Sequence, residues 1–376
     1  MSAPDGDLLI IGTGLIGTSV GLAATAAGWS VRLTDSDPDR ARFAASLGAG
    51  TALDADAVAS PGMESPRLEP PALVLAAVPP AAVGTVCIDA LRRYPQAVVS
   101  HVGSVQSKAA VQVETSGADA TRFLGSHPIA GREVSGPGAA DRDLFVDRPW
   151  VVCRGSATSD RALDLVRRLA TDCRARPVEL APQEHDRLLA RLSHAPQLVA
   201  SALASGVAGL APSDAVLAGS GLRDTTRLAD SDPVMWGQIA AANATALAEA
   251  LRTVAEPLLR MAELLEASPE DAERDVVELM RLGRAGRALL PGKHGRPPVA
   301  LASVLCVIPD EPGALARLFN EVAVVGVNIE DVRVEHAPGQ AVGTAELAVA
   351  PSEQSRLITA LAERGWAASA GAGETL

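Results

Sequence analysis

Gly12-Thr13-Gly14-Leu15-Ile16-Gly17 follows an apolar run at residues 8–11 and opens a stretch of helical spacing that ends at Gly28. A GxGxxG loop between a strand and a helix is the fingerprint of a dinucleotide-binding fold. Gly12 allows the tight turn, Gly14 lets a pyrophosphate approach the backbone, and Gly17 lets the helix pack closely on the sheet. The amides at the start of the helix would receive the phosphates. The loop therefore predicts a doubly wound α/β domain at the start of the chain.

The expected cofactor follows from the residue that ends the second predicted strand. Asp35 lies at the distance from the loop where such folds carry an acidic residue. Its carboxylate can accept hydrogen bonds from two ribose hydroxyls and would repel a 2′-phosphate, which favours NAD over NADP. A glycine turn beside a solvated aspartate is the alternative. The predicted cofactor-binding residues are Gly12, Gly14, Leu15, Ile16, Gly17, Asp35, Val78 and Pro79.

Apolar patterning divides the whole chain into four regions. Residues 1–181 alternate short apolar runs with helical patterns, which predicts a Rossmann-type parallel sheet covered on both faces. Residues 182–290 show only three- and four-residue apolar spacing, which predicts an all-helical domain that pairs with a second copy of the chain. Residues 291–299 have the composition of a linker. Strands are expected at 8–11, 31–34, 73–78, 97–100, 122–125, 150–153 and 175–180.

Residues 300–376 return to a mixture of strands and helices. The expected order is βαββαβ, which is the ferredoxin-like arrangement. Its elements are predicted at 302–308, 313–325, 328–335, 341–350 and 353–364, with a last short strand near Trp366.

Composition narrows the partners and the compartment. A net charge of −12 leaves no basic stripe for nucleic acid. The four cysteines are scattered without metal-ligand spacing and are expected to be reduced core thiols, so no metal site is predicted. The start of the chain lacks a basic segment and a long apolar segment, so no membrane partner is expected and a cytoplasmic location is predicted.

Three segments are expected at the carboxyl edge of the sheet, where ligands of such folds bind. Residues 77–80 would line the nicotinamide side, while Ser104 offers a hydroxyl and His127 an imidazole that titrates near neutrality. Oxidation of an alcohol by hydride transfer needs a base for the hydroxyl proton, and histidine suits that role. The alternative is a structural His127, and His101 is interpreted as structural or peripheral.

Sequence motifs occur in both predicted domains. They are Gly125-Ser126-His127-Pro128-Ile129-Ala130-Gly131-Arg132-Glu133 with Val102-Gly103-Ser104-Val105, then Glu184-His185-Asp186, Arg191-Leu192-Ser193-His194-Ala195-Pro196 and the stretch from Gly221 to Trp236. Together these motifs resemble the prephenate dehydrogenase family of tyrosine biosynthesis. The resemblance covers nearly the whole chain from Leu8 to about Leu265. It implies NAD-dependent oxidative decarboxylation of prephenate to 4-hydroxyphenylpyruvate by a homodimer.

The resemblance also implies roles for individual residues. His127 would pair with the substrate 4-hydroxyl, and Ser104 would support that hydrogen bond. Arg227 would hold the ring carboxylate, with Arg223 four residues away on the same helix face; a solvated face paired with Asp224 is the alternative. The other implied substrate-binding residues are Glu133, at the mouth of the site, and His194 and Gln197.

Three positions depart from the family pattern. His101 stands where an aspartate is frequent, Gln106 where a lysine is common, and Gln197 where a second histidine often lies near the pyruvyl side chain. The neutral amide of Gln197 leaves arogenate, the amino-acid analogue of prephenate, open as the substrate. Two alternative functions remain. The chain could be another hydroxy-acid dehydrogenase, or a sensor that binds nucleotide and amino acid without turnover.

The C-terminal region resembles the ligand-sensing ACT domain through Ile308-Pro309-Asp310-Glu311-Pro312-Gly313-Ala314-Leu315 and Gly326-Val327-Asn328-Ile329. Such modules pair side by side and bind an amino acid at the shared edge, so the resemblance implies feedback regulation with tyrosine as the effector. The implied effector-binding residues are Asp310, Pro312, Gly313, Asn328 and Ile329. A module used only for assembly is the alternative.

Overall fold

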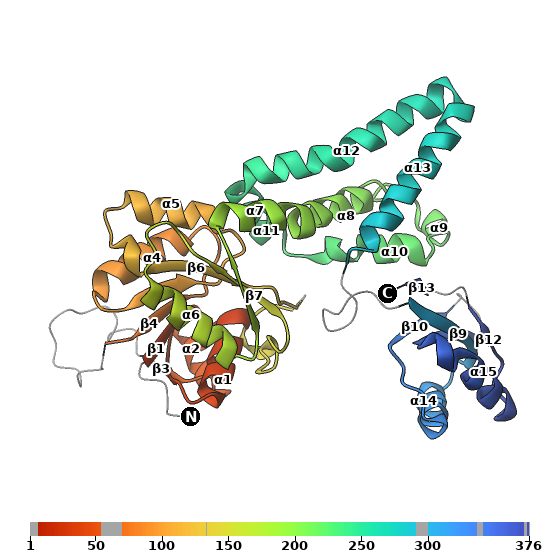
Figure 1. The fold of residues 1–376 in the computed structure, drawn as a ribbon, viewed down its shortest axis with the longest axis horizontal. Helices are drawn as coiled ribbons and strands as arrows, with labels where there is room; N and C mark the ends of the chain where they lie inside the picture. The colour runs from red at the N-terminus through yellow and green to blue at the C-terminus, as the bar shows by residue number, and fades with distance from the viewer. Residues whose placement is uncertain are drawn as a thin grey trace. The chain divides into compact units, whose positions relative to one another are not determined.

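The computed structural model describes residues 7–53, 70–132, 134–290, 300–336, 341–371 and 374–375. The chain folds into two compact units, Met1–Glu256 and Pro257–Leu376 (Figure 1). The first unit contains the glycine loop and most of the helical region, and the second contains the C-terminal sheet. The predicted linker 291–299 and Glu133 lie outside the described residues.

An eight-stranded sheet forms the centre of the first unit, and it departs from the prediction in one connection. Its order is β3-β2-β1-β4-β5-β6-β7-β8. Strand β7 runs antiparallel to β6, so the expected all-parallel sheet is wrong at this pair. A parallel return needs a crossover, usually a helix. In the described part of the connection 129–148, the one regular element is the 3₁₀ turn Pro137–Ala139. The strands are β1 (Asp7–Ile11), β2 (Ser30–Thr34), β3 (Thr51–Ala52), β4 (Leu73–Ala76), β5 (Val98–His101), β6 (Phe123–Pro128), β7 (Pro149–Cys153) and β8 (Arg176–Leu180).

Two predicted strands need correction at their ends, and one observed strand was not predicted. Strand β6 continues to Pro128 rather than stopping at Gly125, because it pairs with β7 along its whole second half. Strand β4 stops at Ala76 rather than Val78. The short strand β3 was not expected; it pairs with β2 through Arg32 and Leu33. His127 therefore lies inside a strand, where the sheet holds its backbone.

Helices cover both faces of this sheet, which makes the domain doubly wound (Figure 1). The alternation along β1 explains the two cores, because successive side chains of a strand point to opposite faces. Leu8 and Ile10 pack in one core and Leu9 in the other. The first core takes its helical side from α1 (Leu15–Ala26), α2 (Pro38–Ser46) and α6 (Asp160–Asp172), and the second from α4 (Val83–Arg93) and α5 (Ser107–Thr115).

The helical region is α7 (Pro182–Leu189), α8 (Ala195–Ser205), α9 (Pro212–Ala215), α10 (Ser220–Thr226), α11 (Pro233–Ala242), α12 (Ala244–Ala267) and α13 (Pro269–Arg287). A π-helical turn at Ala190–His194 joins α7 to α8. Pro196 follows this turn and lacks the amide hydrogen of a regular helix, which explains the local widening. His194 is the last residue of the turn and is buried.

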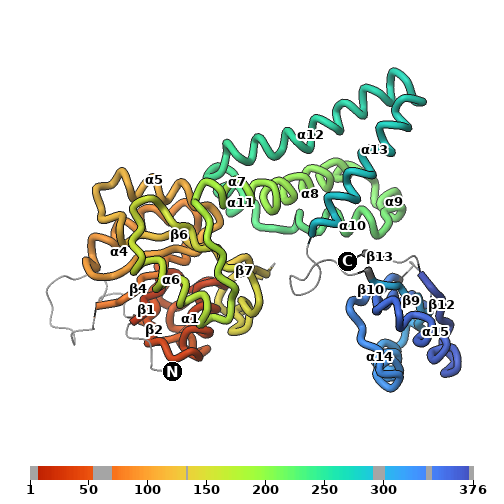
Figure 2. Tube along the Cα trace, viewed as in Figure 1, coloured from red at the N-terminus to blue at the C-terminus, as the bar shows by residue number. Residues whose placement is uncertain are grey.

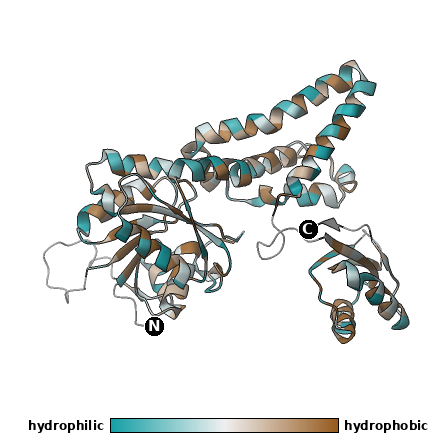
Figure 3. Ribbon diagram, viewed as in Figure 1, coloured by the Kyte–Doolittle hydropathy of each residue, from teal (hydrophilic) through white to brown (hydrophobic). Residues whose placement is uncertain are grey.

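Much of the apolar surface on α12 and α13 is exposed. The main cluster of buried apolar residues in this region is small and contains Ala190, Ala195, Leu247 and Ala250. Figure 3 shows apolar and polar positions alternating along both long helices. The exposed apolar side chains include Leu258, Leu259, Val276, Val277 and Met280. None of the helices in the described ranges is long and apolar enough to cross a membrane.

The C-terminal sheet of the second unit has the order β10-β11-β9-β12 and is antiparallel (Figure 2). Along the chain its elements are β9 (Ala300–Pro309), α14 (Ala314–Val325), β10 (Asp331–His336), β11 (Val342–Val349), α15 (Gln354–Glu363) and β12 (Ala368–Ala370), with β13 (Glu374–Thr375) pairing with β9. This is the βαββαβ order expected from the sequence. Strand β10 starts at Asp331, so Asn328 and Ile329 precede it rather than belonging to it as predicted; Gly326, with φ +74°, ends α14 just before them.

Candidate active site

The glycine loop has the geometry of a phosphate cradle. Gly12 has φ +100°, and a Cβ there would overlap the carbonyl oxygen of Ala77. A Cβ at Gly17 would overlap the carbonyl oxygen of Gly12, whereas one at Gly14 would meet no heavy atom within 4 Å. Two of the three glycines are therefore required by packing, and the third leaves open space over the start of α1. That space is suited to a pyrophosphate.

The remaining predicted cofactor residues surround this loop. Leu15 and Ile16 form the first turn of α1, where backbone amides have no helical partner. Val78 lies against the loop, since its Cγ1 would be 3.2 Å from a Cβ at Gly12. Pro79 follows it and is exposed. These positions are compatible with a bound dinucleotide.

Asp35 is held at the end of β2 as an ionised acceptor. Its Oδ2 accepts hydrogen bonds from the backbone amide of Thr13 at 2.6 Å and the Thr13 hydroxyl at 2.9 Å, and its Oδ1 accepts from the Asp37 amide at 3.0 Å. Burial alone would raise the pKa of Asp35, but the hydrogen bonds from Asp37, Thr13 and Ser36 together lower it. The carboxylate is half-exposed beside the loop.

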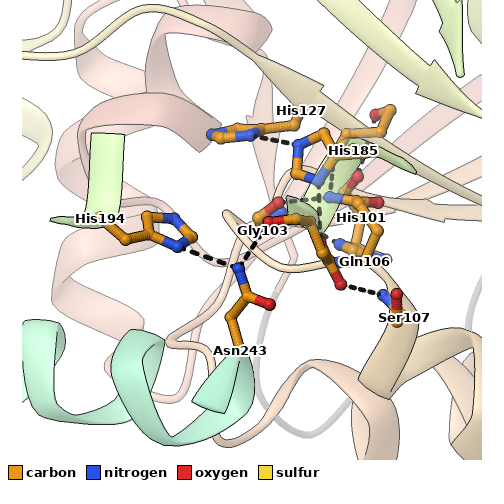
Figure 4. Close-up of polar contacts among 10 residues, drawn as sticks. His101, Gly103, Gln106, Ser107, His127, His185, His194 and Asn243 are labelled. Carbon is orange, nitrogen blue, oxygen red and sulfur yellow. Dashed lines mark hydrogen bonds and ion pairs between the residues drawn. The ribbon is translucent and has the colours of Figure 1, made fainter. Parts of the chain in front are cut away.

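His127 is the first member of a row of three hydrogen-bonded side chains (Figure 4). Its Nδ1 lies 2.9 Å from Nε2 of His185, and Nδ1 of His185 lies 2.8 Å from Oδ1 of Asp186. His185 is fully buried in α7, while His127 is half-buried at the end of β6. Burial, together with the neighbouring histidines His185, His194 and His101, lowers the pKa of His127 to about 3. His127 is therefore neutral at physiological pH.

Asp186 is bound to the start of α5. Its Oδ1 accepts from the amide of Gln106 and its Oδ2 from the amide of Ser107, both at 2.8 Å. Burial acts to raise the pKa of Asp186, but the hydrogen bonds from His185, Ser107 and Gln106 outweigh it and the pKa is lowered. Asp186 is thus an ionised carboxylate at the positive end of a helix.

His194 belongs to the same cluster but has different partners. The side-chain amide nitrogen of Asn243 lies 3.2 Å from Nδ1 of His194 and donates to the carbonyl oxygen of Asp186 at 2.8 Å. The His194 ring meets Trp236 edge-on at 6.0 Å. Burial lowers the pKa of His194 to about 4. His194 is a neutral, well-packed side chain near the histidine row.

His101 is structural in this arrangement. Its Nδ1 accepts from the Gly103 amide at 3.1 Å, and burial lowers its pKa to about 4. Gln106 donates to the carbonyl oxygens of Gly103 and Ser126. A Cβ at Gly125 would overlap the Gln106 amide and come within 3.1 Å of His101. His101 and Gln106, which both depart from the family pattern, therefore fill the space beside Gly125 that a larger residue would occupy.

The other predicted site residues lie in two places. Ser104 follows β5 and lines a small hollow with Pro80 and Ala242, and within the described residues His127 hydrogen-bonds His185 rather than Ser104. The predicted shared helix of Arg223 and Arg227 is wrong in detail, because α10 ends at Thr226 and Arg227 begins a 3₁₀ turn. Both arginines are exposed. Glu133 lies outside the described residues.

Gln197 is buried and tied to the turn that carries Arg227. Its Nε2 donates to the carbonyl oxygen of Leu228 at 2.6 Å, and its Oε1 lies 3.4 Å from the Ser231 hydroxyl. Both ends of the amide are therefore engaged with the protein. Among the side chains that the structure describes, no group of three or more histidine, cysteine or acidic residues could hold a metal ion.

Sequence reasoning missed the roles of His185, Asp186 and Asn243. The motif Glu184-His185-Asp186 was noticed as part of the family resemblance, but spacing could not show that His185 reaches His127, 58 positions earlier. The visible signal was weak, because the His-Asp pair lies within the polar stretch 183–187. Such a pair is rarely buried without partners.

Comparisons with known proteins agree with this geometry. Residues 20–179 match the prephenate dehydrogenase nucleotide-binding domain, and residues 181–282 match the prephenate dehydrogenase dimerization domain. The probable prephenate dehydrogenase NovF of Streptomyces niveus is 32% identical over 369 residues, covering 96% of this chain and 99% of that protein. The cyclohexadienyl dehydrogenase of Zymomonas mobilis is 32% identical, covering 64% of this chain and 82% of that protein.

A solved structure shares both the fold and part of the sequence. It is the prephenate dehydrogenase from A. aeolicus in complex with hydroxyphenyl propionate and NAD+, with 26% identity, a TM-score of 0.67, and coverage of 76% of this chain and 99% of that one. The glycine loop, the sheet and the buried imidazole row define an oxidoreductase of the dinucleotide-binding class. Within that class, the chain belongs to the prephenate dehydrogenase family.

Proposed function

We propose that this chain is an NAD-dependent prephenate dehydrogenase that acts in tyrosine biosynthesis. Its products would be 4-hydroxyphenylpyruvate, carbon dioxide and NADH. Membership of the prephenate dehydrogenase family, with the family's two domains matched over residues 20–179 and 181–282, supports the reaction type. The observation that carries the proposal is the neutral imidazole of His127, at the end of β6 and backed by His185.

NAD fits the residues around the glycine loop. The open space at Gly14 and the amides of Leu15 and Ile16 would take the pyrophosphate, and the ionised Asp35 would accept from the ribose hydroxyls. When bound, NAD supplies the hydride acceptor. Val78 and Pro79 would lie on the nicotinamide side.

The chemistry of prephenate explains why a weak base is enough. Loss of hydride from the hydroxyl-bearing ring carbon leaves an electron deficit, and the two electrons of the bond to the ring carboxylate fill it as carbon dioxide leaves. The ring becomes aromatic, and the phenol keeps its proton, so the balanced reaction releases none. His127 would accept the hydrogen bond of the 4-hydroxyl, take up its proton transiently as positive charge develops, and return the proton to the phenol oxygen.

The substrate also carries two carboxylates. We propose that Arg227 holds the ring carboxylate, with Arg223 close by, because arginine matches a carboxylate through two parallel hydrogen bonds. Gln197 would act by fixing the turn that carries Arg227. Ser104, His194 and Glu133 are proposed to complete the substrate site.

The direct test measures NADH formation by absorbance with NAD and either prephenate or arogenate. We expect turnover with prephenate. Turnover mainly with arogenate would replace the proposed substrate by its amino-acid analogue, and silence on both with NAD still bound would favour a sensor.

His127→Asn tests the base. We expect it to lower kcat by ~10²–10⁴-fold while NAD binding, followed by fluorescence titration, is preserved. Near-normal turnover would remove His127 as the acceptor. His101→Asn is the matched control for a buried histidine outside the row, and we expect it to change kcat far less.

We further propose that the chain works as a homodimer in the cytoplasm. The match of residues 181–282 to a dimerization domain and the exposed apolar side chains of α12 and α13 support the dimer. The four cysteines are buried and unpaired, which fits a reducing compartment. We propose domains at 1–181, 182–290 and 300–376, joined by a linker at 291–299. Sedimentation analysis tests the dimer.

The C-terminal module is proposed to be an ACT domain that binds tyrosine. Its element order and the left-handed Gly313, with φ +87° at the start of α14, support this assignment. Asp310, Pro312, Asn328 and Ile329 would line the effector site with Gly313. A chain ending at residue 290 tests the proposal: tyrosine should inhibit the full chain but not the shortened one. Equal inhibition of both would place the effector elsewhere.

A further inference from the structure

In the row His127–His185–Asp186, the hydrogen bonds that Asp186 accepts determine which atoms donate and which accept along the rest of the row. The amides of Gln106 and Ser107 can only donate, and both point at the carboxylate of Asp186 at 2.8 Å. Asp186 is therefore an acceptor at both oxygens. The lowered pKa of Asp186 agrees with this ionised state.

With His185 taken as a neutral imidazole, its hydrogen bond to Asp186 determines which atom donates in its hydrogen bond to His127. Because Oδ1 of Asp186 accepts, Nδ1 of His185 must donate to it across 2.8 Å. A neutral imidazole has one N–H, so Nε2 of His185 carries a lone pair. The hydrogen bond of 2.9 Å to His127 then requires Nδ1 of His127 to be the donor. Nε2 of His127 is left unprotonated.

We propose that His185 and Asp186 are positioning residues that hold His127 as the Nδ1–H tautomer, with Nε2 kept as the proton acceptor for the substrate hydroxyl. This inference rests on the proposed function for the identity of the hydroxyl. The start of α5 sets the polarity through the amides of Gln106 and Ser107. Neither His185 nor Asp186 touches the substrate in this scheme.

The opposite tautomer of His127 would disable the site. It would present an N–H at Nε2 to the hydroxyl and remove the acceptor. It would also place two lone pairs face to face between His127 and His185, in a buried location where an unmade hydrogen bond is costly. The row thus selects one of two neutral forms that are otherwise close in energy.

Two variants of the full chain test the role of His185 in kinetics. In His185→Gln the amide can still donate to Asp186 and accept from His127, while in His185→Phe it can do neither. We expect kcat to stay within about 10-fold of the wild type for Gln and to fall by ~10²-fold or more for Phe, since a misplaced base loses its share of catalysis. The KM for NAD should not change in either variant. Equal kcat values for the two variants overturn the proposal.

A second measurement needs no substrate and no altered His185. Nitrogen-15 NMR of the full-length wild type, labelled at histidine, reports which ring nitrogen carries the proton, and His127→Asn assigns the signal. We expect a protonated Nδ1 and an unprotonated Nε2 at neutral pH. A protonated Nε2 overturns the proposal. An Nδ1–H ring in a chain that oxidises neither prephenate nor arogenate supports the row and rejects the proposed function, so the two failures are distinguishable.

Discussion

Replacement of Gly14 and Gly17 by alanine separates the two functions of the glycine loop. The same methyl group is added three residues apart at the start of one helix. At Gly14 the new Cβ meets no protein atom within 4 Å. At Gly17 it overlaps the carbonyl oxygen of Gly12 and lies 3.0 Å from Cβ of Ala77. The first change should affect the ligand and the second the fold.

The size of each effect follows from these contacts. Gly17→Ala forces α1 away from the loop, and such overpacking costs ~1–3 kcal/mol. For a folding unit of this size that lowers Tm by roughly 2–12 °C. Gly14→Ala has a backbone that alanine tolerates, with φ −72°, so Tm should stay nearly unchanged. If the pyrophosphate passes over Gly14, the methyl costs a similar ~1–3 kcal/mol in binding, which raises the Kd for NAD by ~5–150-fold.

Thermal unfolding and NAD titration of the two variants check both halves of this argument. Tryptophan fluorescence reports the first unit through Trp29 and Trp150, which are buried there. An unchanged Kd for NAD in Gly14→Ala refutes the placement of the pyrophosphate over the loop. A large loss of stability in the same variant would show that the open space at Gly14 has been misjudged.

Three further outcomes are expected. Asp35→Ser should relax the preference for NAD over NADP, measured as the ratio of kcat/KM for the two cofactors; an unchanged ratio moves ribose recognition elsewhere. Arg227→Ala should raise the KM for prephenate by ~10–10²-fold with a smaller effect on kcat, and Arg223→Ala should raise the KM less. A KM of Arg227→Ala equal to that of the wild type would contradict the assignment. Burial lowers the pKa of His101 and of His194 to about 4, below the ordinary 6.5, so the unfolded chain binds more protons. The free energy of unfolding should therefore fall as pH falls below about 6.5, by about 2 kcal/mol per pH unit near pH 5. Urea titrations at pH 7 and pH 5 measure it, and equal values would contradict the buried neutral state.

Local pattern was sufficient to predict most of the sheet but not the direction of one strand. The run around Trp150 is apolar in either direction, because both faces of the sheet are covered there. Its antiparallel pairing with β6 depends on the path of the connection before it, which lacks a crossover helix in its described residues. Strand β3 escaped prediction because two residues carry no periodicity.

Sequence patterns singled out individual candidate residues but could not show the hydrogen-bond network that joins some of them. His127 was singled out because it follows a predicted strand beside the expected nucleotide edge, and the structure places it inside β6, one residue before that strand ends. Its partner His185 comes from α7, and the amides that fix Asp186 come from the start of α5. No spacing rule links three elements that meet only through tertiary packing. Gln197 shows the same limit, since its hydrogen bond to Leu228 depends on how α8 meets the following turn.

The low pKa of His127 suits the proposed reaction, in which the base takes a proton from the substrate hydroxyl and gives it back to the product. Asp186 acts to raise the pKa of His101, His127 and His194, but burial outweighs it at each ring. The single carboxylate of Asp186 can compensate the charge of one protonated histidine. Protonation of a second histidine in the cluster would leave a buried charge without compensation. A strongly basic imidazole would keep the hydroxyl proton and leave the product as a buried phenolate beside an imidazolium. A weak acceptor with a fixed tautomer instead polarises the hydroxyl while hydride and carbon dioxide leave, and the aromatic product regains its proton without a further proton transfer to solvent.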